Sequence, residues 1–488
     1  MDSPATSSLN PNKHLKEQFV SNLSGSSMLD IFSICVIIPV LILLRREIGF
    51  GFADGSDVGS SKKQDTLAPR CRKTYAVAMA LDFLLFVLPM LMFLSVLAEH
   101  VHAFAIGLTL ILLLCRIVIR YGPPKRGSFP CNNSLKSNVS SYRVAMMIVT
   151  CLCILAVDFR IFPRAFAKTE TYGTSLMDLG VGSFVLTNGL VSREARNISS
   201  KNWRTMLQST FPLLLLGFGR LFSTKGVDYQ VHVGEYGVHW NFFFTLAVVS
   251  ILTSVINIRP QYCGILGALI ISGYQICLLQ GLNEYLVSDK RGRDFISQNK
   301  EGIFSIFGYW GMYLVGVQLA YHLFFQSNHT NTSRRRQQTR SKVWILPFIF
   351  WFLTFILDRH VERVSRRMCN LAYVVLVLAI NFQVLGILMV SDYSDGAKLT
   401  TMEHAFDLNL LGSFLVANVL TGLVNLFVET LFVSSSQAIL ILIIYAFVLC
   451  SVIGVLGFYR FRFKFWLVMP VSFGGNLPTR RRFLESGA

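Results

Sequence analysis

One polar block interrupts an otherwise apolar chain: VDFRIFPRAFAKTETYGTSLMDLG, residues 157–180. Its charged side chains are Asp158, Arg160, Arg164, Lys168, Glu170 and Asp178. A carboxylate beside a long hydrophobic run is costly unless it meets a cation, water or a hydrogen-bond donor inside the protein. The block is therefore a candidate for acid–base chemistry at the edge of a membrane.

A proline in this block decides whether its acid and its amine can meet. On a straight helix, Asp158 and Lys168 would lie about 15 Å apart. Pro163 breaks or restarts a helix, and the residue before it is pushed towards an extended conformation. We therefore expect the segment to fold back and bring Asp158 and Lys168 together. Burial and the neighbouring amine act on the carboxylate in opposite directions, and their balance decides whether Asp158 can act as a base near neutrality.

Three cations of the block, Arg160, Arg164 and Lys168, follow each other at four-residue steps. On any helical stretch this spacing places them on one face, where they would suit a phosphate or pyrophosphate. A second interpretation stays open, because basic residues at helix ends often extend to lipid headgroups and an interfacial aspartate can serve packing alone.

Other polar residues lie inside or beside apolar runs. The stretch EYGVHWNFFFTL (235–246) places His239 and Asn241 at the entrance of a helix, which fits either an aromatic belt or a histidine facing the substrate. Asn418 and Asn425 are seven residues apart, on one helical face, and indicate hydrogen bonds between helices.

Two further polar residues, Arg116 and His322, stand alone in apolar runs and receive no role from the sequence.

Composition identifies the elements that must position these residues. The chain has 488 residues, of which 53% are hydrophobic and 15% charged, and its mean hydropathy is +0.52. Soluble domains have about 25% charged residues, so this is a polytopic membrane protein. Apolar runs of about 20 residues recur along it, each long enough to span a bilayer. We expect an all-α membrane bundle.

The apolar runs predict thirteen transmembrane helices: 28–44, 74–98, 102–119, 141–157, 174–191, 203–222, 241–257, 261–281, 303–325, 341–357, 371–391, 408–431 and 437–458. They form one transmembrane domain, residues 28–458, between an amino-terminal segment, 1–27, and a basic tail, 459–488.

The distribution of Lys and Arg between these runs favours an external amino terminus and a cytosolic tail. Two loops disagree, since 358–370 is basic on the expected outer side and 391–407 is acidic on the inner side. With this orientation, the sequon at Asn22 faces the compartment where glycosylation occurs. The polar stretches 54–73 and 328–342 are predicted to be cytosolic loops.

Several classes of function are excluded. The net charge is +18, but the basic residues sit between apolar runs, where orientation and anionic lipids explain them without a nucleic acid. The ten cysteines are scattered, which favours free thiols over a disulfide framework or a metal site. The chain lacks the GxSxG, P-loop, dinucleotide-binding and HExxH motifs of the corresponding enzymes.

Five stretches carry a resemblance to a known family: 16–31 (KEQFVSNLSGSSMLDI), 158–185 (DFRIFPRAFAKTETYGTSLMDLGVGSFV), 235–246, 301–310 (EGIFSIFGYW) and 410–426 (LLGSFLVANVLTGLVNL). Together they resemble the PIG-W-type inositol acyltransferases, the glucosaminyl-phosphatidylinositol acyltransferases of glycosylphosphatidylinositol (GPI) anchor synthesis. The block around Asp158 is the most specific part of the resemblance.

The resemblance implies a thirteen-span protein of the endoplasmic reticulum membrane with a luminal amino terminus and a luminal catalytic face. It implies transfer of an acyl group, typically palmitoyl, from acyl-CoA to the 2-hydroxyl of inositol in glucosaminyl-phosphatidylinositol. Acyl-CoA would be a co-substrate, and no cofactor would be bound permanently. The partners would be these two substrates and the bilayer, with no nucleic acid.

The resemblance also implies site residues. Asp158 and Lys168 stand where the family has its catalytic pair. Arg160 and Arg164 would face the lipid phosphate or the CoA pyrophosphate. The remaining candidates for contact with substrate are Glu170, Tyr172, Asp178, His239 and Asn241.

Besides a structural partner of another enzyme, two alternatives remain. A membrane-bound O-acyltransferase would use His239 or His322 as the base. A lipid transporter or flippase would use the charged boundary residues to bind a coupling ion.

Overall fold

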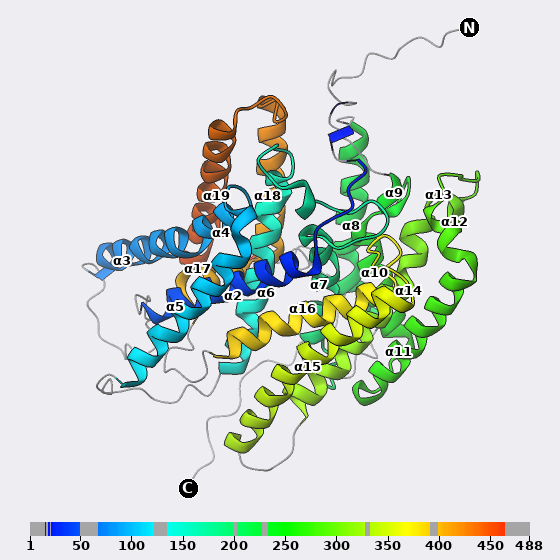
Figure 1. Cartoon of the computed structure of the whole chain (residues 1–488), viewed down its shortest axis with the longest axis horizontal. Coiled ribbons are helices and arrows are strands. Elements are labelled where there is room, and N and C mark those ends of the chain that lie inside the picture. The colour runs from blue at the N-terminus through cyan, green and yellow to red at the C-terminus, as the bar shows by residue number, and fades with distance from the viewer. Residues whose placement is uncertain are drawn as a thin grey trace, which may run out of the picture.

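A computed structural model describes residues 15, 18–19, 21–48, 67–121, 134–198, 203–226, 233–326, 332–390 and 399–463. These ranges form an all-α bundle without strands, which confirms the predicted fold class (Figure 1). Helices suit a membrane because they satisfy their own backbone hydrogen bonds where water is absent. Isolated β-bridges join Gly25 and Ser26 to Thr174.

The long helices are α2 (Met28–Glu47), α3 (Leu67–Asp82), α5 (Val101–Tyr121), α6 (Ser134–Ala156), α7 (Leu176–Leu190), α8 (Trp203–Gly226), α10 (Phe242–Ile256), α11 (Pro260–Cys277), α14 (Lys300–Ala320), α15 (Thr332–His360), α16 (Leu371–Met389), α18 (Leu410–Phe427) and α19 (Ser435–Phe458). The short ones are α4 (Leu88–Phe93), α9 (Val233–Tyr236), α12 (Asn283–Val287), α13 (Phe295–Gln298) and α17 (Thr401–Leu408). Tighter or wider turns are η1 (Phe83–Val87), η2 (Ala98–His100), η3 (Arg164–Phe166), η4 (Leu278–Leu282) and η5 (Tyr321–Phe325).

Ten helical stretches within the described ranges are long and apolar enough to cross a membrane: Met28–Glu47, Arg72–Phe93, Ala98–Val118, Ser137–Ala156, Pro260–Val287, Lys300–Phe325, Gln337–His360, Leu371–Met389, Leu410–Phe427 and Ser435–Phe458. Three predicted runs, 174–191, 203–222 and 241–257, contain shorter apolar helices. A helix of 15 residues such as α7 is about 22 Å long, less than the roughly 30 Å hydrocarbon core. The count of thirteen spans therefore stays a prediction.

Helix α16 lies in the middle of the bundle, buried along nearly its whole length. It packs against α15, α2, α6 and α7 (Figure 1). Its contact with α7 depends on Gly182, where an added Cβ would lie 2.6 Å from Val377 Cγ2 and 2.8 Å from Tyr373 Oη. The missing side chain lets Gly182 N donate a hydrogen bond to that hydroxyl. Small residues allow such close approach between membrane helices.

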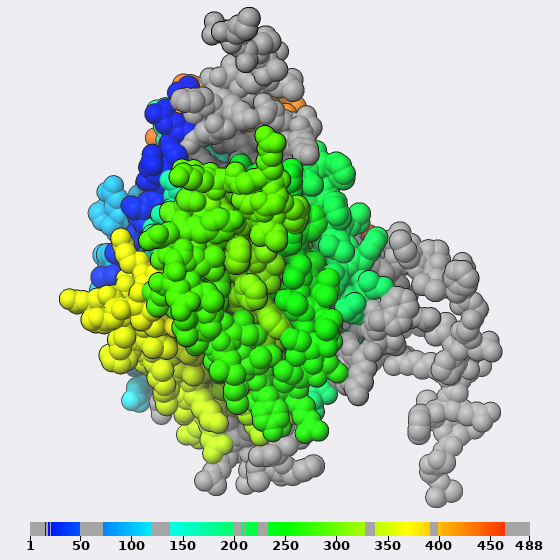
Figure 2. All heavy atoms as spheres, turned by 90° about the vertical axis from the view of Figure 1, so that its right-hand side faces the viewer, coloured from blue at the N-terminus to red at the C-terminus, as the bar shows by residue number. Residues whose placement is uncertain are grey.

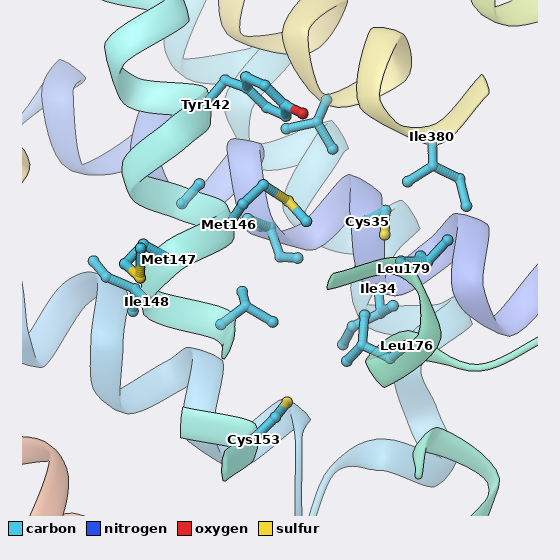
Figure 3. Packing of buried hydrophobic residues seen from close by; sticks show 14 of the residues in the cluster. Ile34, Cys35, Tyr142, Met146, Met147, Ile148, Cys153, Leu176, Leu179 and Ile380 are labelled. Atoms are coloured by element: carbon cyan, nitrogen blue, oxygen red, sulfur yellow. The ribbon is translucent and has the colours of Figure 1, made fainter. Parts of the chain in front are cut away.

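Side chains from four helices fill the core between α2, α6, α7 and α16 (Figure 3). The labelled members include Ile34, Cys35, Tyr142, Met146, Cys153, Leu176, Leu179 and Ile380. Lipid tails are as apolar as these side chains, so their tight packing rather than escape from water holds the helices together.

A second group of helices, α10 to α14, covers the right-hand side of the molecule as drawn in Figure 1. This side faces the viewer in Figure 2, where these helices are green. Helices α11 and α14 approach closely because glycines face each other. A Cβ on Gly267 would lie 2.6 Å from the carbonyl oxygen of Gly311. This pair of helices flanks the short helices α12 and α13, which lie in the loop between them.

Three non-helical segments meet at one end of the bundle because the helices after them start there. Ser175 caps α7, Asn241 caps α10 and Asn370 caps α16, each by accepting hydrogen bonds from backbone N–H groups of the first turn. The preceding residues, 157–175 and 361–370, together with α9, form the candidate site.

Some predictions fall largely outside the described residues. The tail 459–488 is described only to residue 463, the loop 54–73 only from 67, and the loop 328–342 only from 332. The predicted sides of the membrane and the limits of the terminal segments stay predictions.

Candidate active site

The segment after α6 turns back without forming a helix. Helix α6 ends at Ala156, and Pro163 has an extended ψ of 124° just before the single turn η3. The predicted break at Pro163 is confirmed. The predicted stripe of three stacked cations is wrong, because only Arg164–Phe166 is helical and the spacing of four residues places side chains on one face only in a helix.

Arg164 holds this turn closed. Its guanidinium donates hydrogen bonds to three backbone carbonyls of the same turn, those of Val157, Phe159 and Phe162. It also lies 4.1 Å over the ring of Phe19. Burial lowers the pKa of Arg164 to about 10, an effect that neighbouring Asp158 partly opposes. Arg164 is therefore a cation near Asp158, and its Nε and Nη2 donate to backbone carbonyls of its own turn.

Asp158 is half-buried and receives a hydrogen bond from α18. Asn425 Nδ2 donates to Asp158 Oδ2 over 2.8 Å. Asn425 thus bonds to another segment of the bundle, but to the loop after α6 and not to a second helix as predicted. For Asn418 that prediction is wrong, because its amide donates to Phe414 O in the same helix, where an exposed asparagine satisfies itself locally.

Lys168 takes a different partner. Its Nζ lies 2.7 Å from Glu235 Oε1 in α9, and 40% of the lysine side chain is exposed. Burial alone would raise the pKa of Glu235, but Lys168 and Arg366 outweigh it and hold that pKa well below its usual range. The loop thus presents an acid and an amine, each held by a residue from elsewhere in the chain. The expected approach of Lys168 to Asp158 stays a prediction, and Asn425 supplies a hydrogen bond that orients the Asp158 carboxylate.

Asp178 braces the loop. Its Oδ1 lies 2.7 Å from Arg366 Nε, and its Oδ2 accepts hydrogen bonds from Thr169 N and Oγ1. Tyr373 Oη donates to the backbone carbonyl of Asp178 over 2.7 Å. Asp178 was a candidate for contact with substrate, but both of its carboxylate oxygens have protein partners and its side chain is buried.

A second carboxylate, Glu362, fastens the loop 361–370. It accepts hydrogen bonds from four neutral donors, in Tyr172, Gln275, Asn283 and Asn370. Burial and the nearby Glu362 raise the pKa of Tyr172. Tyr172, another candidate for contact with substrate, thus ties the predicted site to this loop.

The amino-terminal segment is joined to the same region. Asn22 N donates to Glu170 Oε2 over 2.8 Å, and Glu170 N donates to Leu23 O. Ser26 N donates to Thr174 O over 2.7 Å. The exposed candidate Glu170 thus has one oxygen engaged by backbone.

Two glycines make this junction possible. Gly25 has φ +83° and Gly173 has φ +128°, values that other residues rarely adopt. A Cβ on Gly173 would lie 2.1 Å from Ser24 O, and one on Gly25 would lie 2.2 Å from Thr174 O.

The remaining candidates divide between exposed and structural positions. Arg160 is exposed. His239 is half-buried, and its backbone N–H donates to Asn299 Oδ1. Asn241 is buried and has structural contacts, since its oxygen caps α10 and its Nδ2 donates one hydrogen bond to Gly217 O.

The second candidate base, His322, lies far from this region. It belongs to η5, at the opposite end of the α14 span from Glu301, which is about 30 Å away along the helix. Glu301 itself lies 2.9 Å from Arg367, next to Arg366. Of the two histidines proposed as bases, His239 is the one close in sequence to Glu235, the partner of Lys168.

No cluster of three His, Cys, Asp or Glu residues that could hold a metal ion occurs among the described residues.

Comparison with known proteins identifies the family. A family model described as GWT1 matches residues 12–456. The chain is 53% identical to an uncharacterized protein of Arabidopsis thaliana, with 88% of this chain and 99% of that protein covered. It is 30% identical to the phosphatidylinositol-glycan biosynthesis class W protein of Dictyostelium discoideum (93% and 99% covered) and 36% identical to GPI-anchored wall transfer protein 1 of Aspergillus oryzae (90% and 96%).

This chain belongs to the GWT1 family. The resemblance found in the sequence is thereby confirmed, and the GWT1 match covers every site residue from Asp158 to Asn425.

Sequence reasoning missed three members of this GWT1-family site. Glu235 opens a stretch that carried the resemblance, but only its histidine and asparagine were considered. Glu362 and Arg366 lie in the loop 358–370. This loop is basic on the side where the charge rule expects few cations, and that conflict could have marked it as part of a site. The conflict has a structural reason, because Arg366 and Arg367 are buried in ion pairs rather than facing either side of a membrane.

Proposed function

We propose that this protein moves a fatty acyl group, typically palmitoyl, from acyl-CoA to the 2-hydroxyl of inositol in glucosaminyl-phosphatidylinositol. As a GWT1-family member it is an inositol O-acyltransferase of GPI-anchor biosynthesis. It is a multi-pass membrane protein, so a lipid acceptor within the bilayer fits it. The thioester donor, the glucosaminyl acceptor and the acyl length belong to the proposal.

The observation that carries the chemistry is one loop that presents a carboxylate and an amine, each held from outside the loop. Asn425 donates a hydrogen bond to Oδ2 of Asp158 and so fixes the orientation of the carboxylate that would accept the proton. A fixed hydrogen bond on one oxygen orients the other, and correct placement of a base is a large part of its rate contribution.

Lys168 serves the developing negative charge. Its amine is held by Glu235, and 40% of its side chain is exposed, so the side chain is within reach of a substrate oxygen. A prepositioned cation next to an oxyanion is among the strongest contributions to acyl transfer.

The bonds balance in a single transfer. The inositol 2-hydroxyl oxygen attacks the thioester carbonyl, and Asp158 takes the hydroxyl proton. The carbonyl oxygen gains negative charge beside Lys168. The C–S bond then breaks as the carbonyl re-forms, CoA leaves as a thiolate, and the proton on Asp158 is available to it. A thioester is already activated, so neither a covalent enzyme intermediate nor a permanently bound cofactor is needed.

The cations have separate tasks. Arg160 is exposed and suits the phosphate of the lipid or of CoA. Arg164 keeps the turn closed through its backbone contacts. Glu170, Tyr172 and His239 line the same region and stay candidates for contact with substrate.

We place the protein in the endoplasmic reticulum membrane, with its amino terminus and the Asp158 loop in the lumen and its tail in the cytosol. The support is the distribution of Lys and Arg together with the odd number of predicted spans. Buried Arg366 and Arg367 need not follow the charge rule, which removes part of the conflict within 358–370.

The test is a reconstituted reaction without an ion gradient. Purified full-length protein is mixed with palmitoyl-CoA and a glucosaminyl-phosphatidylinositol analogue, and the acylated lipid is measured by mass spectrometry. We expect acylation with palmitoyl-CoA but not with free palmitate. If folded protein does not acylate the lipid, the proposed function is wrong. Transport of the lipid without acylation would favour the flippase alternative.

Two substitutions test the residues. Asp158→Asn and Lys168→Ala should each lower turnover more than about 100-fold. Asp407→Asn is the matched control, because Asp407 is also a part-exposed aspartate near a cation, 3.6 Å from Arg143, and has no role in the proposed reaction. Near-normal turnover in Asp158→Asn together with loss in His239→Ala would favour the histidine base instead.

A further inference from the structure

The contacts around Lys168 form a closed ring. Lys168 Nζ lies 2.7 Å from Glu235 Oε1, and Arg366 Nη2 lies 3.1 Å from the same oxygen. Arg366 Nε lies 2.7 Å from Asp178 Oδ1. Asp178 Oδ2 then accepts hydrogen bonds from the backbone N–H and the hydroxyl of Thr169, the residue bonded to Lys168. The ring thus reaches Lys168 twice, through its amine and through its backbone.

Exposure falls along this ring. The side chain of Lys168 is 40% exposed, that of Glu235 18%, and that of Arg366 only 2%. The ring pairs two carboxylates with two cations, and Arg220 adds a further positive charge near Glu235. Arg366 is the buried member that joins both carboxylates, and its planar fork of N–H donors allows it to do so at fixed angles.

Arg366 is itself anchored. Its loop is joined to the Lys168 segment by two hydrogen bonds, from Gly173 N to Val364 O and from Ser365 Oγ to Thr171 O. Burial would lower the pKa of Arg366, but the carboxylate of Glu235, then that of Asp178, outweighs burial and holds it well above its usual value. The guanidinium is therefore a permanent charge at a fixed place.

We propose that Arg366 is a positioning residue for Lys168. It sets the place of the amine through Glu235 and the place of the backbone through Asp178 and Thr169. Arg366 does not touch substrate, and the inference rests on the proposed role of Lys168 in acyl transfer. A displacement of about 1 Å in a reacting group can cost about 100-fold in rate, so such control matters.

The first test is Arg366→Lys, which keeps the charge but replaces the fork with one point of contact. We expect kcat to fall about 10- to 100-fold, with KM for palmitoyl-CoA and for the lipid changed less than about threefold. Glu235→Gln gives a second variant of similar shape, which breaks the link to Lys168 and leaves Arg366 paired with Asp178. It should show the same loss in kcat.

Arg46→Lys is the matched control. Arg46 in α2 is also buried, 4% exposed, and pairs with the buried carboxylate of Glu403. Neither residue belongs to the ring or to the candidate site, so Arg46→Lys should keep kcat within about threefold of the unsubstituted protein. Equal losses of kcat in Arg366→Lys and Arg46→Lys at equal thermal stability would overturn the inference.

A double-mutant cycle separates positioning from general damage. If Arg366 acts through Lys168, then Arg366→Lys should change the residual turnover of Lys168→Ala less than about twofold. A further fall of tenfold or more in that background would contradict the inference. Near-normal turnover in Lys168→Ala alone would contradict the proposed function instead, so the two failures can be told apart.

Discussion

Ion pairs of two kinds lie near the two ends of α2. They differ in the exposed fraction of their side chains. At the carboxyl end of α2 the pairs Arg45 with Asp82 and Arg46 with Glu403 are closed, with every side chain at most 4% exposed. At the amino end, near the Asp158 loop, Lys168 is 40% exposed while its partner Glu235 is 18% exposed.

The difference separates a structural task from a chemical one. The pairs at the carboxyl end of α2 hold α2 to α3 and α17, and their charges have no exposed side for a ligand. The ring around Lys168 buries its fixed members and leaves one amine accessible. Substitutions at the two ends should therefore damage different properties, stability at one and turnover at the other.

The largest effect on turnover is expected for Lys168→Ala. Turnover should fall more than about 100-fold, whereas the apparent melting temperature should change by less than about 3 °C, because a part-exposed ion pair contributes little to stability. Both are measured on purified protein, by lipid acylation and by thermal unfolding in detergent. A large loss of stability with normal turnover per folded molecule would reverse the comparison.

The largest effect on stability is expected for Arg46→Met. The substitution leaves Glu403 buried without its cation, which costs about 3–5 kcal/mol in free energy of unfolding. Thermal unfolding should show this loss, while turnover per folded molecule stays within about threefold.

The double variant Arg46→Met with Glu403→Met is the control for this effect. Replacing a whole buried ion pair by apolar side chains is often neutral, so the double variant should recover most of the stability. A double variant less stable than Arg46→Met would show that the pair does more than neutralise charge.

An intermediate effect is expected for Gly173→Ala. The new Cβ would meet Ser24 O at a φ that alanine disfavours, so we expect a loss of about 1–3 kcal/mol together with lower turnover, since the junction lies beside Lys168. Gly107→Ala is the control, because no atom lies within 4 Å of its added Cβ. If both alanines behave alike, the junction does not support the site.

A smaller effect is expected for Tyr172→Phe. It removes one of four hydrogen-bond donors to Glu362, which should cost about 0.5–1.5 kcal/mol. Turnover should fall less than about threefold if Tyr172 only braces the loop. A much larger fall would assign Tyr172 to contact with substrate.

The smallest effect concerns pH. The pKa of Glu235 is lower in the folded than in the unfolded chain, so its stabilisation is present above the ordinary value of 4.5 and is lost as pH falls below that value. The difference in melting temperature between the unsubstituted protein and Glu235→Gln should therefore be constant near neutral pH. It should shrink as the pH falls below 4.5. A difference that grows on acidification would contradict this assignment.

The fold was largely predictable because each membrane helix requires a long apolar run, which can be recognised in the sequence. All thirteen predicted runs contain an apolar helix, although three are too short to count as spans by length. The interruption of helical structure around Pro163 was predictable for the same local reason, since proline limits the backbone wherever it occurs.

The partners of the site residues were not predictable. Glu235, Arg366 and Asn425 reach the Asp158 loop from three other segments, and local preferences do not say which segments dock together. The stacked cations failed because four-residue spacing has meaning only in a helix. The basic loop 358–370 was the one long-range clue, since an arginine that violates the charge rule must find its counter-charge inside the protein.

The junction between residues 22–27 and 170–174 has a consequence for how the chain is made. Hydrogen bonds across it join residues 148 positions apart. Residues 22–27 are made before residues 170–174, so they must wait without these partners until the loop after α6 has been synthesised and delivered to the same side. A nascent chain halted before residue 174 should keep this segment open to proteases, and a complete one should protect it.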